Sequence, residues 1–136
     1  MLLMVFSSSA LGAAGGSPPP QRFPLSPGCS ITSSDLAGQF KSAGLIKGFT
    51  KLDITWRANW VLSGCSLPIY VIAYLELIAD DNTVASTFHW SYELKKDKFK
   101  PSGYVEEDMK TAIGMRSIRL VRIRAITRQQ YEADKR

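Results

Sequence analysis

Four arginines are set among aliphatic residues near the C-terminal end of the sequence. The segment SIRLVRIRAITR, residues 117–128, carries them as Arg119, Arg122, Arg124 and Arg128. Guanidinium groups pair bidentately with phosphate, and several together give salt-sensitive binding that ignores base sequence. A strand face with these residues is therefore a candidate phosphate-binding surface. The alternative is a solvated outer face on which the arginine stems lie over neighbouring apolar groups.

A second basic stretch, KKDKFK, occupies residues 95–100. The predicted nucleic-acid-binding set consists of the cations of both stretches and the preceding Arg116: Lys95, Lys96, Lys98, Lys100, Arg116, Arg119, Arg122, Arg124 and Arg128. The 136-residue chain has a formal net charge of +5, and Arg22 is the only cationic residue among the first forty. The excess of positive charge therefore lies towards the C-terminus. It favours anionic partners, either nucleic acid or an acidic membrane surface.

Signatures of catalysis are missing from the sequence. The single histidine, His89, stands near Ser91, but no nucleophile elbow, orienting acid or glycine-rich oxyanion motif accompanies the pair. The acidic run at residues 106–108 lacks the spacing of a calcium loop, and no phosphate-cradling glycine loop is present. We therefore predict no enzyme activity, no metal and no cofactor, and interpret His89 as a surface or interface residue.

The two cysteines, Cys29 and Cys65, have neither zinc-ribbon nor CxxC spacing. We interpret them as free thiols or small apolar fillers, and a bridge between them becomes plausible if the protein is secreted. The N-terminal stretch MLLMVFSSSALGAAGG lacks the basic start of a signal peptide, so cleavage is possible but not favoured. A membrane span needs about twenty apolar residues, so no transmembrane segment is predicted.

Composition divides the chain near residue 34. Five of the seven prolines, with many glycines and serines, precede that point, so residues 1–34 are predicted to form a flexible extended arm. Residues 35–136 are predicted to form one β-sandwich domain.

Three segments of that domain have strand patterns. Apolar and polar residues alternate through TKLDITWRANW, which predicts a strand with one face on the core. LPIYVIAYLELIA is apolar on both faces and is typical of a central strand, and VASTFHWSYEL alternates as the return arm of a hairpin. On the second face of the central strand, Tyr70 and Tyr74 are the predicted interface residues.

The arginine segment is also predicted to be a strand. Val121, Ile123 and Ala125 would share one face, with Arg122 and Arg124 on the other, and the earlier Ile118 and Leu120 require a bulge or bend. Residues 95–104 are predicted to form a loop and residues 105–115 a short helix, because acidic residues favour a helix N-terminus. These elements predict an all-β antiparallel sandwich with at most one short helix.

The order of these segments resembles a known family. GQFKSAGLIKGFTKLDITWRANW, LPIYVIAYLELIADDNT and the basic strand SIRLVRIRAI are together similar to the strand order of jelly-roll coat proteins of small positive-strand RNA plant viruses. The resemblance implies a jelly-roll-like sandwich, self-association into a homo-oligomer, RNA binding, and a location in the virion or host cytoplasm. Coat-protein arms usually carry many cations, whereas this arm has only Arg22, and 136 residues leave little room for eight full strands.

Three functions therefore remain open. The first is a coat-like structural protein that self-assembles and binds RNA through a basic sheet face. The second is a viral nucleic-acid-binding protein of cell-to-cell movement or of silencing suppression, since movement proteins resemble coat proteins in fold. The third is a small secreted β-sandwich binding module with its leader removed and Cys29 joined to Cys65.

Overall fold

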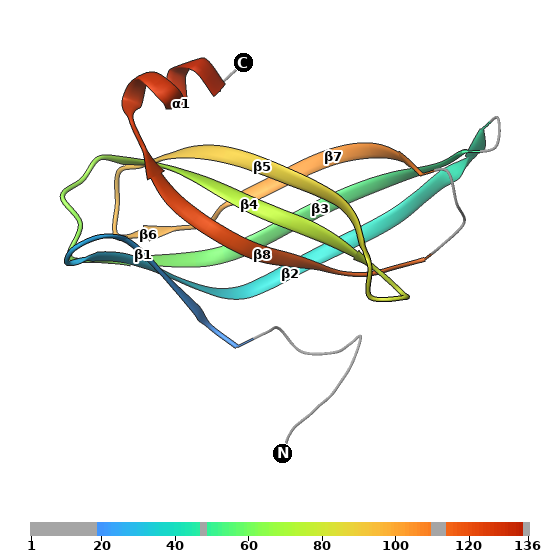
Figure 1. The fold of residues 1–136 in the computed structure, drawn as a ribbon, viewed down its shortest axis with the longest axis horizontal. Helices are drawn as coiled ribbons and strands as arrows, with labels where there is room; N and C mark the ends of the chain where they lie inside the picture. Colours follow the sequence, from blue (N-terminus) through green and yellow to red (C-terminus); the bar gives the residue numbers. More distant parts are fainter. Residues whose placement is uncertain (1–18, 47–48, 110–113, 135–136) are drawn as a thin grey trace.

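The computed structural model describes residues 19–46, 49–109 and 114–134. They form two antiparallel β-sheets packed face to face, followed by one short helix (Figure 1). The strands of the first sheet, sheet A, are β1 (Gln21–Ser26), β2 (Cys29–Ile46), β3 (Phe49–Ser63), β6 (Lys98–Phe99) and β7 (Ser102–Met109). The strands of the second, sheet B, are β4 (Ile69–Ala79), β5 (Val84–Leu94) and β8 (Met115–Ile126). The predicted all-β antiparallel sandwich is confirmed.

Sheet A is a meander with a branched edge. Its strands run in the order β1, β2, β3, and both β6 and β7 pair with the far side of β3. The predicted alternation of β3 is confirmed, because its even-numbered residues from Leu52 to Leu62 are all buried. One buried polar group there is satisfied: the indole Nε1 of Trp60 donates a hydrogen bond of 3.1 Å to Ser33 Oγ.

Sheet B has the predicted central strand. β4 lies between β5 and β8, and its residues Val71, Ala73, Leu75 and Leu77 are almost completely buried between the sheets. The predicted hairpin into β5 is also confirmed. Its turn is fixed by Asn82 in the left-handed region, at φ 69°, and by Asp81 Oδ1, which accepts the backbone N–H of Thr83 at 3.0 Å.

The predicted boundary of the N-terminal arm is wrong. Residues from Gln21 onward belong to the sandwich, because β1 and the first part of β2 form a paired hairpin of sheet A. The tight turn between them uses Pro27 and then Gly28 at φ 82°, the geometry in which glycine avoids the steric cost of a left-handed residue. Two of the prolines that predicted a flexible arm lie instead in this turn and in edge strand β1, where proline is tolerated. Within the rest of the predicted arm, residues 1–18 lie outside the described residues.

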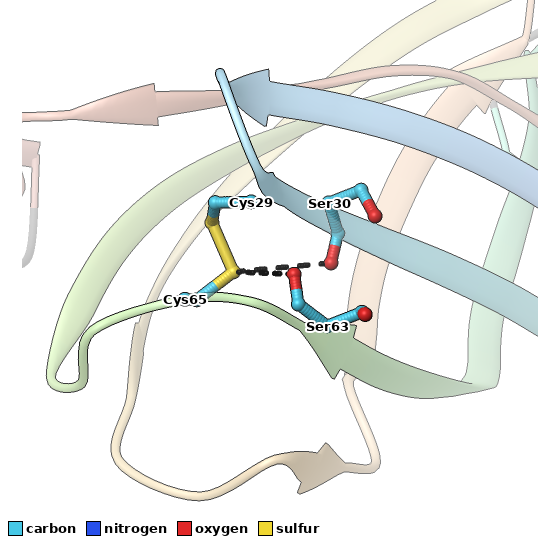
Figure 2. Close-up of a disulfide and its surroundings, with 4 residues drawn as sticks. All are labelled: Cys29, Ser30, Ser63 and Cys65. Carbon is cyan, nitrogen blue, oxygen red and sulfur yellow. Dashed lines mark hydrogen bonds between the residues drawn. A yellow bond between two sulfur atoms is a disulfide. The ribbon is translucent and has the colours of Figure 1, made fainter.

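The interpretation of the cysteines as free thiols is also wrong. Cys29, at the start of β2, forms a disulfide with Cys65 in the segment after β3, with Cα atoms 4.6 Å apart (Figure 2). The bridge sits beside the ends of both strands, and Cys65 Sγ lies 3.5 Å from the carbonyl oxygen of Ser63. It closes the end of the β2–β3 hairpin opposite to its connecting turn. The bridged pair is the arrangement expected for the secreted alternative.

The short helix predicted at residues 105–115 is wrong for its described part. Residues 102–109 form β7, an edge strand in which Tyr104, Glu106 and Asp108 are exposed and alternate with half-buried residues. Acidic side chains protect a free sheet edge from pairing, and they also stabilise a helix N-terminus. The acidic run therefore does not distinguish an edge strand from the start of a helix. Residues 110–113 lie outside the described residues. The preceding predicted loop contains β6, whose Phe99 packs on Trp60.

The chain ends in the one helix of the described residues, α1 (Arg128–Asp134). A capping box starts it: the Gln130 N–H donates to Thr127 Oγ1 at 3.0 Å, and the Thr127 N–H donates to Gln130 Oε1 at 2.9 Å. The helix packs against β4 and β5 and lies at the same end of the sandwich as β6 and the β1–β2 turn (Figure 1).

Candidate nucleic-acid interface

Two bulges in β8 determine where its arginines point. The pairing of β8 with β4 shifts between Ser117 and Met115, and again between Arg122 and Leu120, so that Arg116 and Val121 are the extra residues. The second bulge lets Ile118, Leu120 and Ile123 all reach the core, and Val121 is 48% exposed. The predicted bulge is therefore present. Val121 does not share the face of Ile123 as predicted, because it is the bulged residue itself.

The outer face of sheet B carries three of the predicted arginines. Register with the outward-facing residues of β4 places Arg119 beside Glu76, Arg122 beside Tyr74 and Arg124 beside Ile72. This surface, here called the outer face, is completed by residues of β5 that pair with the same positions of β4. Its members on the three strands are Thr87, His89, Ser91, Glu93, Tyr70, Ile72, Tyr74, Glu76, Arg119, Arg122 and Arg124.

The arginines of β8 differ in how far they are neutralised. Arg119 forms an ion pair with Glu76 in which its Nε lies 3.0 Å from Glu76 Oε1. Arg116, near the β4–β5 turn, donates to the side-chain oxygen of Asn82. Within the described residues, no carboxylate lies at ion-pair distance from Arg122 or Arg124. Their charge is therefore available to an anionic ligand.

Tyr74 is at the centre of this charged surface. Its hydroxyl accepts a hydrogen bond from Arg124 Nε at 3.0 Å, and Arg124 Cζ lies 5.8 Å from the centre of the Tyr74 ring. On the other side His89 of β5 has its ring centroid 6.3 Å from that of Tyr74. The cation thus lies close to the tyrosine ring, a geometry with a favourable electrostatic contribution.

Tyr70, the other predicted interface residue, contacts the chain's own helix. Tyr131 of α1 lies on its ring, with centroids 5.2 Å apart. Partial burial and the carboxylate of Glu93, whose Oε2 is 3.4 Å from the Tyr70 hydroxyl, raise the pKa of Tyr70. The outer face is therefore covered by α1 at the Tyr70 end, whereas Tyr74 lies towards its middle.

The predicted lysines do not extend the outer face as one surface. Lys98 pairs with Val61 of β3, whose side chain is 46% exposed, while the neighbouring pair of Phe99 and Trp60 points into the core. Lys98 therefore lies on the outside of sheet A, opposite to the arginines. Lys95 follows β5 directly and is within 3.9 Å of Glu93. Lys96 is exposed in the connection from β5 to β6, and Lys100 is exposed between β6 and β7.

The side chains of Ser91 and His89 both contact Asp134, but the three residues do not form a catalytic triad. Asp134 of α1 lies between them, accepting the Ser91 hydroxyl at Oδ2 and lying 3.5 Å from His89 Nε2 at Oδ1. In a triad the histidine lies between the nucleophile and the acid. Here the carboxylate takes that place, so the three residues serve to attach α1 to β5. Sequence reasoning missed Asp134 because no local pattern links position 134 to positions 89 and 91.

A groove runs along the seam between β1 and β8. Its volume is about 450 Å³, and its lining comes from Pro19, Gln21, Leu36 and residues 117–120. Gln21 Nε2 donates to the carbonyl oxygen of Leu120 at 3.3 Å, so a side chain partly satisfies the free edge of β8.

In the described ranges, no group of His, Cys, Asp and Glu side chains is arranged to hold a metal ion. No described helix is long and apolar enough to cross a membrane.

Comparison with known proteins identifies no relative of the chain. No family model, no curated protein and no solved structure gives a significant match to the chain.

Proposed function

We propose that the protein binds RNA through the outer face of sheet B, the role that the coat-like and the movement-protein hypotheses share. One observation carries the proposal: Arg122 and Arg124 project from the same face of β8 beside Tyr74, and no carboxylate among the described residues neutralises them. Two unpaired guanidinium groups on a flat sheet face suit a sugar–phosphate backbone that runs across the strands.

The distribution of acidic groups agrees with this assignment. Glu76 is matched by Arg119, and the other carboxylates of this face, Glu93 and Asp134, lie at its α1 end next to Lys95 and His89. The segment of β8 from Arg122 to Arg124 has no described carboxylate at ion-pair distance and keeps its positive charge. The exposed acidic residues Glu106 and Asp108 lie on β7, in the other sheet. A polyanion is therefore attracted to one side of the sandwich and repelled from the β7 edge.

A salt titration with paired variants tests the proposal. Arg122→Gln combined with Arg124→Gln removes the two unpaired cations, and Lys98→Gln combined with Lys100→Gln removes the same charge elsewhere. A plot of log K against log salt has a negative slope, and its magnitude decreases by about one for each phosphate that the protein no longer neutralises. We therefore expect the slope to become shallower by about two in the arginine variant only. Equal slopes in the two variants, or binding that does not change with salt, contradict the proposal.

Self-association belongs to the coat-like hypothesis and is tested separately. Exposed carboxylates on the free edge of β7 disfavour pairing of two β7 strands, so a homo-oligomer must use other surfaces. Negative-stain microscopy and size-exclusion chromatography, with and without RNA, measure the assembled species. A monomer under all salt conditions contradicts the coat-like function and leaves the RNA-binding function intact.

The disulfide favours a second candidate function, a secreted β-sandwich binding module. A bridge between Cys29 and Cys65 persists in oxidising compartments and is rare in the cytosol. Intact mass of the protein recovered from its host, measured under non-reducing conditions, distinguishes the secreted module from the RNA-binding viral protein. An oxidised chain that has lost residues from its N-terminus supports secretion, and a full-length reduced chain contradicts it.

A further inference from the structure

Tyr74 presents an aromatic ring on the outer face of sheet B with cations on one side of it. It lies on the central strand, paired with His89 on β5 and with Arg122 on β8. Tyr74 is half-buried, and its hydroxyl accepts the hydrogen bond of 3.0 Å from Arg124 Nε. A ring held in this way is a fixed platform and not a mobile surface side chain.

The chain itself places a second ring on an equivalent tyrosine. Tyr70 faces outward on the same strand four residues before Tyr74, about 13 Å away along β4. Tyr131 of α1 lies on it at a centroid separation of 5.2 Å and an interplanar angle of 39°. A flat ring is therefore accommodated on this face above a β4 tyrosine. On Tyr74 the aromatic neighbour within the described residues is His89, at the longer separation of 6.3 Å.

Both cations lie on the β8 side of the Tyr74 ring. Arg122 and Arg124 are two residues apart on β8, which corresponds to about 7 Å, and both lie on the face of Tyr74. Arg124 is held near the ring by its hydrogen bond to the tyrosine hydroxyl, whereas Arg122 is exposed. One ligand can thus place a planar group on the ring and a phosphate on each guanidinium.

Resting on the proposed function, we infer that the ligand of this face is single-stranded RNA, with one base stacked on Tyr74 and its flanking phosphates on Arg122 and Arg124. A duplex keeps the faces of its bases inside the helical stack and offers only phosphate and groove edges to a flat sheet. A sulfated sugar chain offers anions but no aromatic face. Only an unpaired strand uses both the ring and the cations of the outer face.

The test compares three probes against three variants of the full-length oxidised protein. The probes are a fluorescein-labelled 12-nucleotide single-stranded RNA, the same RNA annealed to its complement, and heparin. The variants are Tyr74→Leu, which removes the ring, Tyr74→Phe, which keeps the ring and loses the hydroxyl, and Tyr104→Leu as a matched control. Tyr104 is 56% exposed and lies on β7 of the other sheet.

We expect Tyr74→Leu to weaken binding of the single strand about tenfold, within the range found when stacking aromatics are removed. Tyr104→Leu is expected to stay within about twofold of the parent protein. Tyr74→Phe keeps the ring but removes the hydroxyl that holds Arg124, so it is expected to lose less affinity than Tyr74→Leu. Binding of heparin is expected to change less than about twofold in all three variants, because charge alone governs it. Thermal unfolding of each variant checks that the fold is kept, and if Tyr74→Leu does not fold, the expected preference of the parent protein for the single strand over the duplex tests the inference.

The outcomes separate this inference from the proposed function. Equal affinity for the single strand, the duplex and heparin, with no effect of Tyr74→Leu, overturns the stacking inference and leaves charge-driven RNA binding in place. Preference for the duplex also overturns it. No detectable binding of any probe by the parent protein ends the proposed function itself.

Discussion

Trp56 and Gly103 lie directly opposite each other on β3 and β7, and the indole occupies the space that a side chain at position 103 needs. A Cβ added to Gly103 would overlap Trp56 Nε1 and come within 2.7 Å of Trp90 Cε2. Trp56 is 2% exposed and its ring centroid is 5.6 Å from that of Trp90. The glycine therefore allows the two sheets to pack through a tryptophan pair.

Gly103→Ala is expected to destabilise the fold by about 1–3 kcal/mol, because both indoles are held by the core and cannot move aside cheaply. Urea unfolding followed by tryptophan fluorescence measures the loss. Ser102→Ala is the matched control, since its side chain is exposed and is expected to change stability by less than about 0.5 kcal/mol. Equal unfolding midpoints for the two variants would refute this account of how Gly103 packs against Trp56 and Trp90.

Loss of the Cys29–Cys65 bridge is expected to cost about 3–4 kcal/mol of the free energy of unfolding. The bridged residues are 36 apart, and a crosslink across a loop of that length restricts the unfolded chain by about this amount. The double variant Cys29→Ala with Cys65→Ala, unfolded in urea, measures it, and addition of reductant to the parent protein is the independent check. A parent protein whose midpoint does not respond to reductant contradicts the bridge.

The sandwich was predictable from sequence wherever a strand has one face on the core. The alternation from Leu52 to Trp60 follows from burial of one face, and the buried run of β4 was assigned by its β-branched and aromatic residues. Residues 21–34 and 102–109 were misassigned for one shared reason. Proline, glycine and acidic residues are characteristic of flexible segments and helix starts, but they also occur at sheet edges, and only pairing with a neighbouring strand distinguishes these cases.

The candidate interface was predictable in three of its arginines, Arg119, Arg122 and Arg124, and in Tyr70 and Tyr74, but not in its other residues or its layout. Alternation in β8 placed Arg122 and Arg124 on one face, as the register with β4 has it. Which cations are neutralised depends on contacts across long sequence separations, such as Arg119 with Glu76, and no local pattern encodes them. For the same reason the sequence could not place Lys98 on the opposite side of the sandwich.

Stability at alkaline pH is expected to depend on Tyr92. Burial raises the pKa of Tyr92, and its hydroxyl donates a hydrogen bond of 2.9 Å to the Ser102 carbonyl. In the unfolded chain the phenol ionises near pH 10, whereas in the folded protein it stays protonated. Its contribution is therefore complete below about pH 10 and is lost as the pH rises from there towards the folded-state pKa.

Denaturant titrations at pH 8 and near pH 11 test the role of Tyr92. Tyr92→Phe removes the ionising group, so its stability should fall less than that of the parent protein between the two pH values. Tyr104→Phe is the comparison, because it removes an exposed phenol from the β7 edge of sheet A. Desolvation and the hydrogen bond to Asp53 also raise the pKa of Tyr104, but this phenol is exposed, so its removal is expected to have a smaller effect than Tyr92→Phe. If all three proteins lose the same stability, Tyr92 does not govern the alkaline limit.

Helix α1 is expected to depend on its capping box. Seven residues are too few for a stable isolated helix, and α1 has no buried residue, so the cap and the contacts of Tyr131 and Asp134 hold it on sheet B. Thr127→Ala removes the acceptor of the Gln130 N–H and is expected to cost about 1 kcal/mol of local stability. Hydrogen exchange should then accelerate at the Tyr131 amide, which donates to the Thr127 carbonyl at 3.0 Å. Gln129→Ala, at an exposed position of the same turn, should leave that rate unchanged, and acceleration in both variants alike would mean that the cap is not what holds the helix.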